Sequence, residues 1–305
     1  MSSKKVHIVI LNYNGKQDTL ECLETLLLAK KPNFLTQIIV VDNASTDGSV
    51  ISIRKYFPKV KILKNKKNLG FASGNNVGIQ YAIKNHADYV FILNNDTLIE
   101  KKCIQNLFKT AESNKKAGII SPKIYFAKEF EFHKNRYQKA DLGKVIWYAG
   151  GRIDWQNVLG IHFGVDQVDN GQFAQKKLIK FASGCAMFVK AVTFKKIGLF
   201  DPRYYLYLED ADFCTRAIKE GLKILYEPKA VLWHKNAQTA GGSGSSLQEY
   251  YYTRNRMLFG LRYASIKTRL ALIKESLRFL VRGTKWQKIA IKDFYLQRFG
   301  SGSYR

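Results

Sequence analysis

The sequence predicts an α/β protein built on a doubly wound, mostly parallel β-sheet, and two observations carry that prediction. Over the first 120 of its 305 residues, short apolar runs alternate with segments of helical spacing. Each apolar run is continuous, which is typical of strands that crossover helices bury on both faces. The composition agrees, because 46% hydrophobic and 13% aromatic residues supply enough material for a packed core.

The expected elements follow one another in a regular order. Residues 6–11 form a continuous apolar run and predict the first buried strand, and leucines at helical spacing predict a helix over residues 18–28. The further elements expected in this half are strands at 37–41, 61–63 and 89–93 and helices at 49–56 and 75–85. Ligands of such sheets bind beyond the carboxyl ends of the strands, so the loops that follow the strands are the candidate site.

The second half of the chain is less regular. Between residues 128 and 180, glycines interrupt a series of aromatic residues, which indicates hairpins and loops. Regular structure is expected again at 180–190, and a helix at 209–220 that Gly221 ends. The Gly/Ser-rich stretch 240–246 is a candidate mobile loop or domain boundary.

The formal net charge of +26 implies an anionic partner, which could be nucleic acid, an anionic membrane surface or a phosphorylated substrate. Lysine-rich solvated faces explain part of this charge. They do not explain its concentration in residues 254–305, where 13 Lys and Arg stand against Glu275 and Asp293.

The same tail has an apolar stripe at helical spacing, formed by Leu270, Ile273, Leu277 and Leu280. Arg and Lys residues lie between these four positions. Two interpretations stay open. The tail lies on an anionic membrane, with Trp286, Ile289 and Phe294 inserted at the interface, or its stripe packs on the rest of the protein and its charges face water.

The four cysteines are scattered without a Cys-x-x-Cys pair, so we expect small buried side chains and no zinc or disulfide role. No apolar run approaches the roughly 18–20 residues of a membrane span. Residues 1–5 lead straight into a strand and lack the apolar core of a signal peptide. We therefore expect a cytoplasmic protein, with the inner face of the plasma membrane as a second location.

Polar residues follow three of the predicted strands. Asp42 follows the second strand, where a carboxylate can accept hydrogen bonds from a pyrimidine or a ribose, and Tyr13 after the first strand can stack on a base. Asp96 follows the strand at 89–93 and can hold a hard divalent ion that neutralises a pyrophosphate leaving group. Taken alone, each of these two aspartates also fits a turn or a helix cap.

Three acids in four residues open the predicted helix at 209–220, namely Glu209, Asp210 and Asp212. Fewer acidic residues than this are enough to interact favourably with the dipole at a helix N-terminus. A hydroxyl that attacks in a transfer reaction must lose its proton as the new bond forms, so a carboxylate that faces it is a natural general base. We assign this role to Asp210, with Glu209 orienting the acceptor.

Six segments carry a family resemblance when taken together and in order. They are residues 12–15 (Asn-Tyr-Asn-Gly), 42–49, 68–78, 93–97 (Leu-Asn-Asn-Asp-Thr), 198–201 and 208–212 (Leu-Glu-Asp-Ala-Asp). With them the chain resembles family 2 glycosyltransferases over residues 6 to about 260. Within that family it is most similar to the rhamnosyltransferase-like branch of surface-polysaccharide enzymes, which residues 147–154 and 250–256 also resemble.

The resemblance implies a GT-A fold and an inverting, single-displacement transfer. The expected catalytic domain is residues 1–240, with a nucleotide-sugar-binding half at 1–120 and an acceptor-binding half at 121–240. A basic amphipathic helical tail at 247–305 would follow it. The expected partners are a dTDP- or UDP-sugar as donor and a glycan or lipid-linked acceptor, and no nucleic acid is expected.

The resemblance also implies roles for single residues. Asp210 is the base beside Glu209, and Asp96 holds Mg²⁺ or Mn²⁺. His234 lies where related enzymes have a second metal or diphosphate ligand, and a structural histidine is the alternative. The expected nucleotide-sugar-binding residues are Asn12, Tyr13, Asp42, Asn43, Ser45, Asn68, Gly74, Asn75, Asn95 and Arg254.

Two departures from the family pattern matter. The metal motif begins with Asn94 in place of an aspartate, which leaves one firm carboxylate. The Gln-x-x-Arg-Trp motif of processive synthases is absent from the sequence, so addition of one sugar or a few is expected. The competing hypotheses are a catalytically inactive nucleotide- or sugar-binding member of the fold and, from its charge, a nucleic-acid-binding protein.

Overall fold

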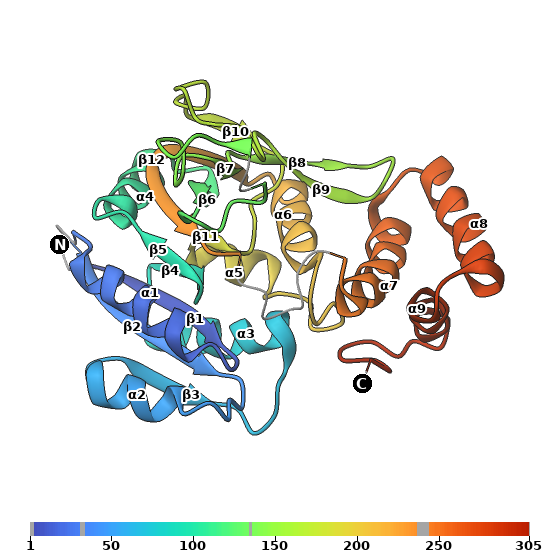
Figure 1. Cartoon of the computed structure of the whole chain (residues 1–305), viewed down its shortest axis with the longest axis horizontal. Helices are drawn as coiled ribbons and strands as arrows, with labels where there is room; N and C mark the ends of the chain where they lie inside the picture. Colours follow the sequence, from blue (N-terminus) through green and yellow to red (C-terminus); the bar gives the residue numbers. More distant parts are fainter. Residues whose placement is uncertain (1–2, 31–33, 134–135, 237–243, 305) are drawn as a thin grey trace.

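A mixed β-sheet crosses the molecule in the strand order β10-β12-β6-β11-β4-β1-β2-β3, with β5 paired to β12 and β7 to β6 (Figure 1). The computed structural model describes residues 3–30, 34–133, 136–236 and 244–304. The strands are β1 (Lys4–Asn12), β2 (Phe34–Asp42), β3 (Lys61–Lys64), β4 (Tyr89–Asn94), β5 (Thr97–Ile99), β6 (Ala117–Phe126), β7 (Ile146–Tyr148), β10 (Lys177–Ile179), β11 (Ala186–Lys190) and β12 (Lys223–His234).

The helices are α1 (Lys16–Leu28), α2 (Ser49–Tyr56), α3 (Gly70–Lys84), α4 (Cys103–Ser113), α5 (Ala191–Ile197), α6 (Glu209–Lys219), α7 (Ser246–Tyr263), α8 (Ile266–Arg282) and α9 (Lys285–Tyr295). A separate antiparallel hairpin joins β8 (Gly151–Asp154) to β9 (Leu159–His162), in the region where hairpins are expected from the sequence.

The predicted α/β fold class with a mostly parallel central sheet is confirmed. Strand β1 pairs in parallel with β2 and β4, and β2 pairs in parallel with β3. Strand β11 is antiparallel to both of its neighbours, β4 and β6, and separates this parallel half from the parallel pair β6 and β12. The carboxyl ends of β1, β2 and β4 therefore meet at one edge of the sheet.

Helix α3 begins at Gly70, earlier than the start at residue 75 that the sequence pattern predicts. Two glycines in this first stretch weaken its intrinsic helix propensity, so the pattern alone places the start too late. A tertiary contact supplies the missing stabilisation, because the carbonyl of Tyr205 accepts hydrogen bonds from the N–H groups of Phe71 and Ala72 at 2.7 and 3.1 Å.

The C-terminal helices pack partly on the sheet-bearing part of the protein. Met257, Phe259 and Leu272 are buried in the same hydrophobic cluster as the strands of the sheet. Trp286 and Ile289 are half-buried against Tyr250 and its neighbours, so the expectation that they insert into a membrane does not match their packing. Phe294 likewise packs on the main core.

Part of the tail nevertheless stays uncovered. Leu270, Ile273 and Leu277 of the predicted stripe are exposed, whereas Leu280 packs on the core. Of the Gly/Ser-rich stretch, residues 240–243 lie outside the described residues, and Ser245 caps α7 by accepting a hydrogen bond from the Gln248 N–H at 3.2 Å. No helix in the described part of the chain is long and apolar enough to cross a membrane.

Candidate active site

The ends of β1 and β2 lie side by side, because Asn12 is the register partner of Asp42. The Asn12 side chain is fully buried and donates from Nδ2 to Asp42 Oδ1 at 3.2 Å and to Ser45 Oγ at 3.1 Å. Its Oδ1 accepts from the Gly15 N–H at 3.2 Å. Asn95 Nδ2 lies 3.4 Å from the same oxygen. One amide thus holds together the loops that follow β1, β2 and β4.

A second buried amide organises the loop before α3. Asn43 donates to Asn68 Oδ1 at 2.7 Å and accepts from the Leu69 N–H at 3.1 Å. A Cβ at Gly74 would come within 2.6 Å of Leu11 and 3.2 Å of Asn43, so glycine is what allows α3 to approach β1 here.

Two of the expected donor-binding residues, Asn75 and Tyr13, have a polar atom or an aromatic ring that could contact a ligand. Asn75 is buried and donates to the Phe71 carbonyl at 3.0 Å, and its Oδ1 has no hydrogen-bond partner among the residues that the structure describes. Tyr13 is 44% exposed beside the sheet edge. Its hydroxyl is near enough to Tyr205 to contribute, after burial, to the raised pKa of that phenol.

Asp96 and His234 are brought together by the antiparallel pairing of β5 with β12, in which His234 lies opposite Thr97. Both side chains are buried, and His234 Nε2 is 3.1 Å from Asp96 Oδ1. Burial lowers the pKa of His234, but Asp96 and Cys185 together raise it well above its usual value.

No cluster of three or more His, Cys, Asp or Glu side chains suited to a metal ion occurs within the described ranges. The carboxylate–imidazole pair of Asp96 and His234 still fits a divalent cation as half of a site. Mg²⁺ and similar ions take one or two protein ligands and complete their coordination with water and substrate phosphates. The donor set is therefore compatible with a metal bound together with a diphosphate.

Of the two acids at the start of α6, Glu209 is buried and Asp210 is half-buried, and the pKa of each is raised. Asp210 accepts from the Gly184 N–H at 2.9 Å and from the Ala211 N–H at 2.8 Å. Burial raises the pKa of Asp210 to about 6, against the effect of these hydrogen bonds. Burial and the Asp210 charge raise the pKa of Glu209 well above its usual value. Burial thus favours the protonated form of Glu209, and the unequal shifts within the pair resemble those of acid–base sites.

A short backbone path connects these acids to the Asp96 site. The Gly184 N–H binds Asp210, and the carbonyl of the next residue, Cys185, accepts from the Asn94 N–H at 2.8 Å. Burial raises the pKa of the Cys185 thiol, His234 lowers it in part, and the charges of Asp96 and Asp210 raise it again. The thiol therefore lies within electrostatic reach of both the predicted base and the predicted metal ligand.

The loop before α6 has an unusual backbone. Tyr205, Tyr207 and Leu208 have φ of 64°, 68° and 69°, in the left-handed region that residues with side chains avoid. The Asn255 side chain holds this loop, since its Nδ2 donates to the carbonyls of Tyr204, Leu206 and Tyr207 at 2.8–2.9 Å.

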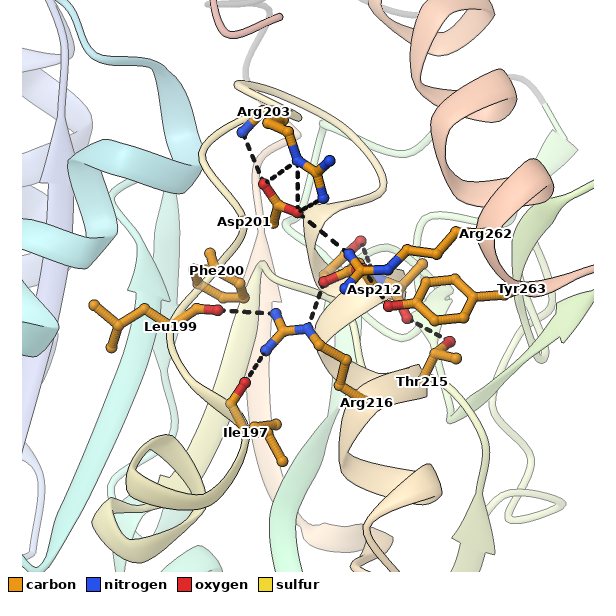
Figure 2. A network of polar contacts seen from close by, with 12 residues as sticks. Ile197, Leu199, Phe200, Asp201, Arg203, Asp212, Thr215, Arg216, Arg262 and Tyr263 are labelled. Carbon is orange, nitrogen blue, oxygen red and sulfur yellow. Dashed lines mark hydrogen bonds and ion pairs between the residues drawn. The ribbon is translucent and has the colours of Figure 1, made fainter.

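Helix α6 is also fixed from its other side (Figure 2). The fully buried Asp212 carboxylate accepts from Arg216 Nε at 2.7 Å, from Arg262 Nη1 at 3.2 Å and from the Tyr263 hydroxyl at 2.7 Å. Arg216 also donates to backbone carbonyls ahead of the loop, those of Ile197 and Leu199. The third acid of the cluster is therefore a structural anchor that joins α6 to α7.

Arg254 lies apart from the other predicted donor-binding residues. It is fully buried, and its guanidinium donates to the carbonyls of Tyr204 and Gly300 at 3.0 and 2.8 Å. These contacts stabilise the loop before α6, and a role in donor binding stays a prediction. The sequence pattern does not reveal the roles of Gly184 and Asn255, although Asn255 lies in the segment 250–256 that also contains Arg254.

The strand-end loops, the buried acids and the mixed sheet together define a glycosyltransferase of the GT-A type. Residues 7–197 match the family described as Glycosyl transferase family 2, which is more than half of the chain. The protein belongs to glycosyl transferase family 2, in its rhamnosyltransferase-like branch.

Relatives with assigned activities are distant but cover most of the chain. The low-salt glycan biosynthesis hexosyltransferase Agl10 of Haloferax volcanii is 24% identical, over 82% of this chain and 74% of its own length. The N-acetylglucosaminyl-diphospho-decaprenol L-rhamnosyltransferase of Mycobacterium tuberculosis is 23% identical, over 78% of each chain. The chain is thus a sugar-transferring enzyme, as predicted.

Solved structures confirm the GT-A fold. GalNAc-T7 with UDP, GalNAc and Mn²⁺ superposes with a TM-score of 0.67 at 14% identity, over 96% of this chain. This chain spans only 56% of that longer protein. TarS of S. aureus superposes with a TM-score of 0.56 at 14% identity, over 95% of this chain and 78% of the TarS chain.

Proposed function

We propose that the protein moves a single sugar, rhamnose or a hexose, from a nucleotide-diphosphate donor to an acceptor hydroxyl with inversion at the anomeric carbon. The observation that carries this proposal is the Glu209–Asp210 pair. One acid of the pair has a pKa of about 6, whereas that of the other is well above its usual value. Asp210 is connected to Asn94, at the end of the strand before Asp96, through the backbone of Gly184 and Cys185.

Asp210 is the proposed general base. Its carboxylate is ionised near neutral pH and accepts the proton of the acceptor hydroxyl as that oxygen attacks the sugar. The hydrogen bonds from Gly184 and Ala211 keep the carboxylate oriented. Glu209, a buried acid whose pKa is raised, is proposed to orient the acceptor by a hydrogen bond, and its Oε2 has no partner among the described residues.

Asp96 and His234 are proposed to hold Mg²⁺ or Mn²⁺. When bound, such an ion would neutralise the charge that develops on the diphosphate leaving group. The 3.1 Å separation of the two side chains supports this assignment. So do two related folds solved with Mn²⁺, GalNAc-T7 and the mannosyltransferase PcManGT of Pyrobaculum calidifontis with GDP-Man.

The donor half is proposed to be residues 1–120. Asp42 would bind the base or ribose, Tyr13 would stack on the base, and the polar residues around them would complete the site. A dTDP- or UDP-sugar is the proposed donor, because relatives include a dTDP-rhamnosyl transferase of Shigella flexneri. The acceptor half, residues 121–240, would bind a glycan or a lipid-linked intermediate. The named activity of the Mycobacterium relative supports this choice.

A donor screen tests the proposal. UDP-, dTDP- and GDP-sugars are each added with Mn²⁺, with Mg²⁺ or with chelator, and the thermal midpoint and the release of nucleoside diphosphate are measured. We expect a metal-dependent shift and slow hydrolysis with one donor. A flat response across the panel, together with stabilisation by RNA or DNA, would contradict the proposal and favour a nucleic-acid-binding protein.

A further inference from the structure

Helix α8 presents an uncovered apolar face that the rest of the described protein does not pack against. Five aliphatic side chains on it are 39–75% exposed: Ile266, Leu270, Ile273, Leu277 and Val281. At about 100° per residue they fall within an arc of about 80°, so they form one continuous stripe. We call these five residues the α8 stripe.

The stripe is distinct from the face by which α8 is held in the fold. Leu272 and Ser276 are buried on that other face. Leu272 packs so closely on α7 that a Cβ at Gly260 would come within 2.2 Å of it, and Val158 of the β8–β9 turn lies at the same glycine. The helix is therefore anchored without the stripe, and Figure 1 shows α8 on the outer side of the C-terminal helices.

The surroundings of the stripe are strongly basic. The exposed cations on or next to α8 are Lys267, Lys274, Arg278, Arg282 and Lys285. Glu275 is the acid on this helix, and it is half-buried and paired with Arg256 at 3.2 Å. Cations that flank an apolar stripe match a surface with phosphates outside and hydrocarbon beneath.

We propose that the α8 stripe and its flanking cations dock the protein on an anionic lipid bilayer, with the helix lying parallel to the surface. The aliphatic side chains enter the boundary between headgroups and acyl chains, and the Lys and Arg side chains contact lipid phosphates. The membrane-binding residues are then those of α8, and Trp286 and Ile289 serve the internal packing of the tail. The inference does not depend on the sugar transfer, because the contact needs neither donor nor acceptor.

Co-sedimentation of the full-length protein with vesicles tests this proposal. Vesicles of phosphatidylcholine with about a third phosphatidylglycerol are compared with pure phosphatidylcholine, at about 0.1 M salt. We expect binding to the anionic vesicles that weakens at least tenfold in the combined variant Leu270→Ser and Leu277→Ser. Neutralising Lys274, Arg278 and Arg282 to Gln lowers binding about fivefold per residue, on anionic vesicles only.

The matched control is the combined variant Leu28→Ser and Ile51→Ser, which removes aliphatic side chains of comparable exposure (66% and 75%) from α1 and α2. It should bind vesicles as the unaltered protein does. Circular dichroism and light scattering verify that each variant is folded and report its oligomeric state.

Absence of vesicle binding by the unaltered protein would overturn the proposal. Undiminished binding by the Leu270→Ser and Leu277→Ser variant would do the same. If that variant instead turns a dimer into a monomer and leaves vesicle binding intact, the stripe is an interface between two copies. Donor hydrolysis without vesicles, measured in parallel, shows whether the transferase proposal fails separately.

Discussion

Replacing Asn255 with alanine removes the amide that holds the backbone ahead of α6. The Asn255 side chain is fully buried, and its Nδ2 donates to three carbonyls at 2.8–2.9 Å. A buried acceptor that loses its donor costs about 1–3 kcal/mol. Because one NH₂ group has two hydrogens, the three contacts amount to about two full hydrogen bonds, and we expect a loss of about 2–6 kcal/mol in the free energy of unfolding.

The rate of transfer should fall further than this loss of stability requires. Tyr205, Tyr207 and Leu208 occupy the left-handed region, at a cost of about 1 kcal/mol or more each. Without Asn255 the loop can relax, and the Glu209–Asp210 pair that follows it would shift. A displacement of about 1 Å at a reacting group costs about a hundredfold in rate. Donor affinity should change less than the rate, since Asn12 and Asp42 lie on β1 and β2.

Urea denaturation and steady-state transfer assays measure the two effects. Asn85→Ala is the control, because Asn85 Nδ2 donates to a single carbonyl, that of Tyr81, at 2.8 Å at the end of α3. We expect that control to lose no more than about 1 kcal/mol and to keep its activity. If Asn255→Ala is no less stable than Asn85→Ala and transfers sugar at the normal rate, the assigned role of Asn255 is wrong.

Three further perturbations follow from the geometry. The transfer rate should fall about tenfold per pH unit below about 6, because protonated Asp210 accepts no proton. A pH–rate profile of the acceptor reaction without this fall would argue against Asp210 as the general base. His234→Ala should raise the Mn²⁺ concentration needed for half-maximal donor hydrolysis about tenfold or more, and an unchanged Mn²⁺ titration would remove His234 from the metal site. Gly78→Ala should lower the free energy of unfolding in urea by about 1–3 kcal/mol, because the added Cβ would lie 2.4 Å from Val9 and 2.9 Å from Val41. An unaltered urea midpoint would show that α3 can move away from the sheet.

The sequence predicts most of the parallel half because its signals are local. Helix α2 has the bounds expected from the pattern, and β3 and β4 each extend one residue further. The strand ends, and hence Asn12, Asp42 and Asp96, follow directly from those runs. The start of α3 could not be predicted, because the Tyr205 carbonyl that stabilises it comes from a loop far away in sequence.

The candidate site was only partly visible for the same reason. The acids of α6 form a local cluster that the sequence displays, but their different roles depend on burial. Asp212 is tied to Arg262 and Tyr263, whereas Asp210 is bound by the backbone of Gly184. A glycine that contributes only an N–H group and space leaves no sequence signal. The exposure of the α8 stripe likewise could not be predicted, since an amphipathic pattern does not show which face a neighbour covers.

The role of Asp210 is tested most directly by Asp210→Asn, measured in single-turnover transfer and in donor binding by calorimetry. The substitution keeps the size of the side chain and removes its capacity to take a proton. We expect transfer to fall by about a hundredfold or more, within the range of general-base catalysis, while donor affinity stays within about twofold. Normal turnover in Asp210→Asn would contradict the proposed mechanism, because the proton of the acceptor hydroxyl would then have to leave by another group.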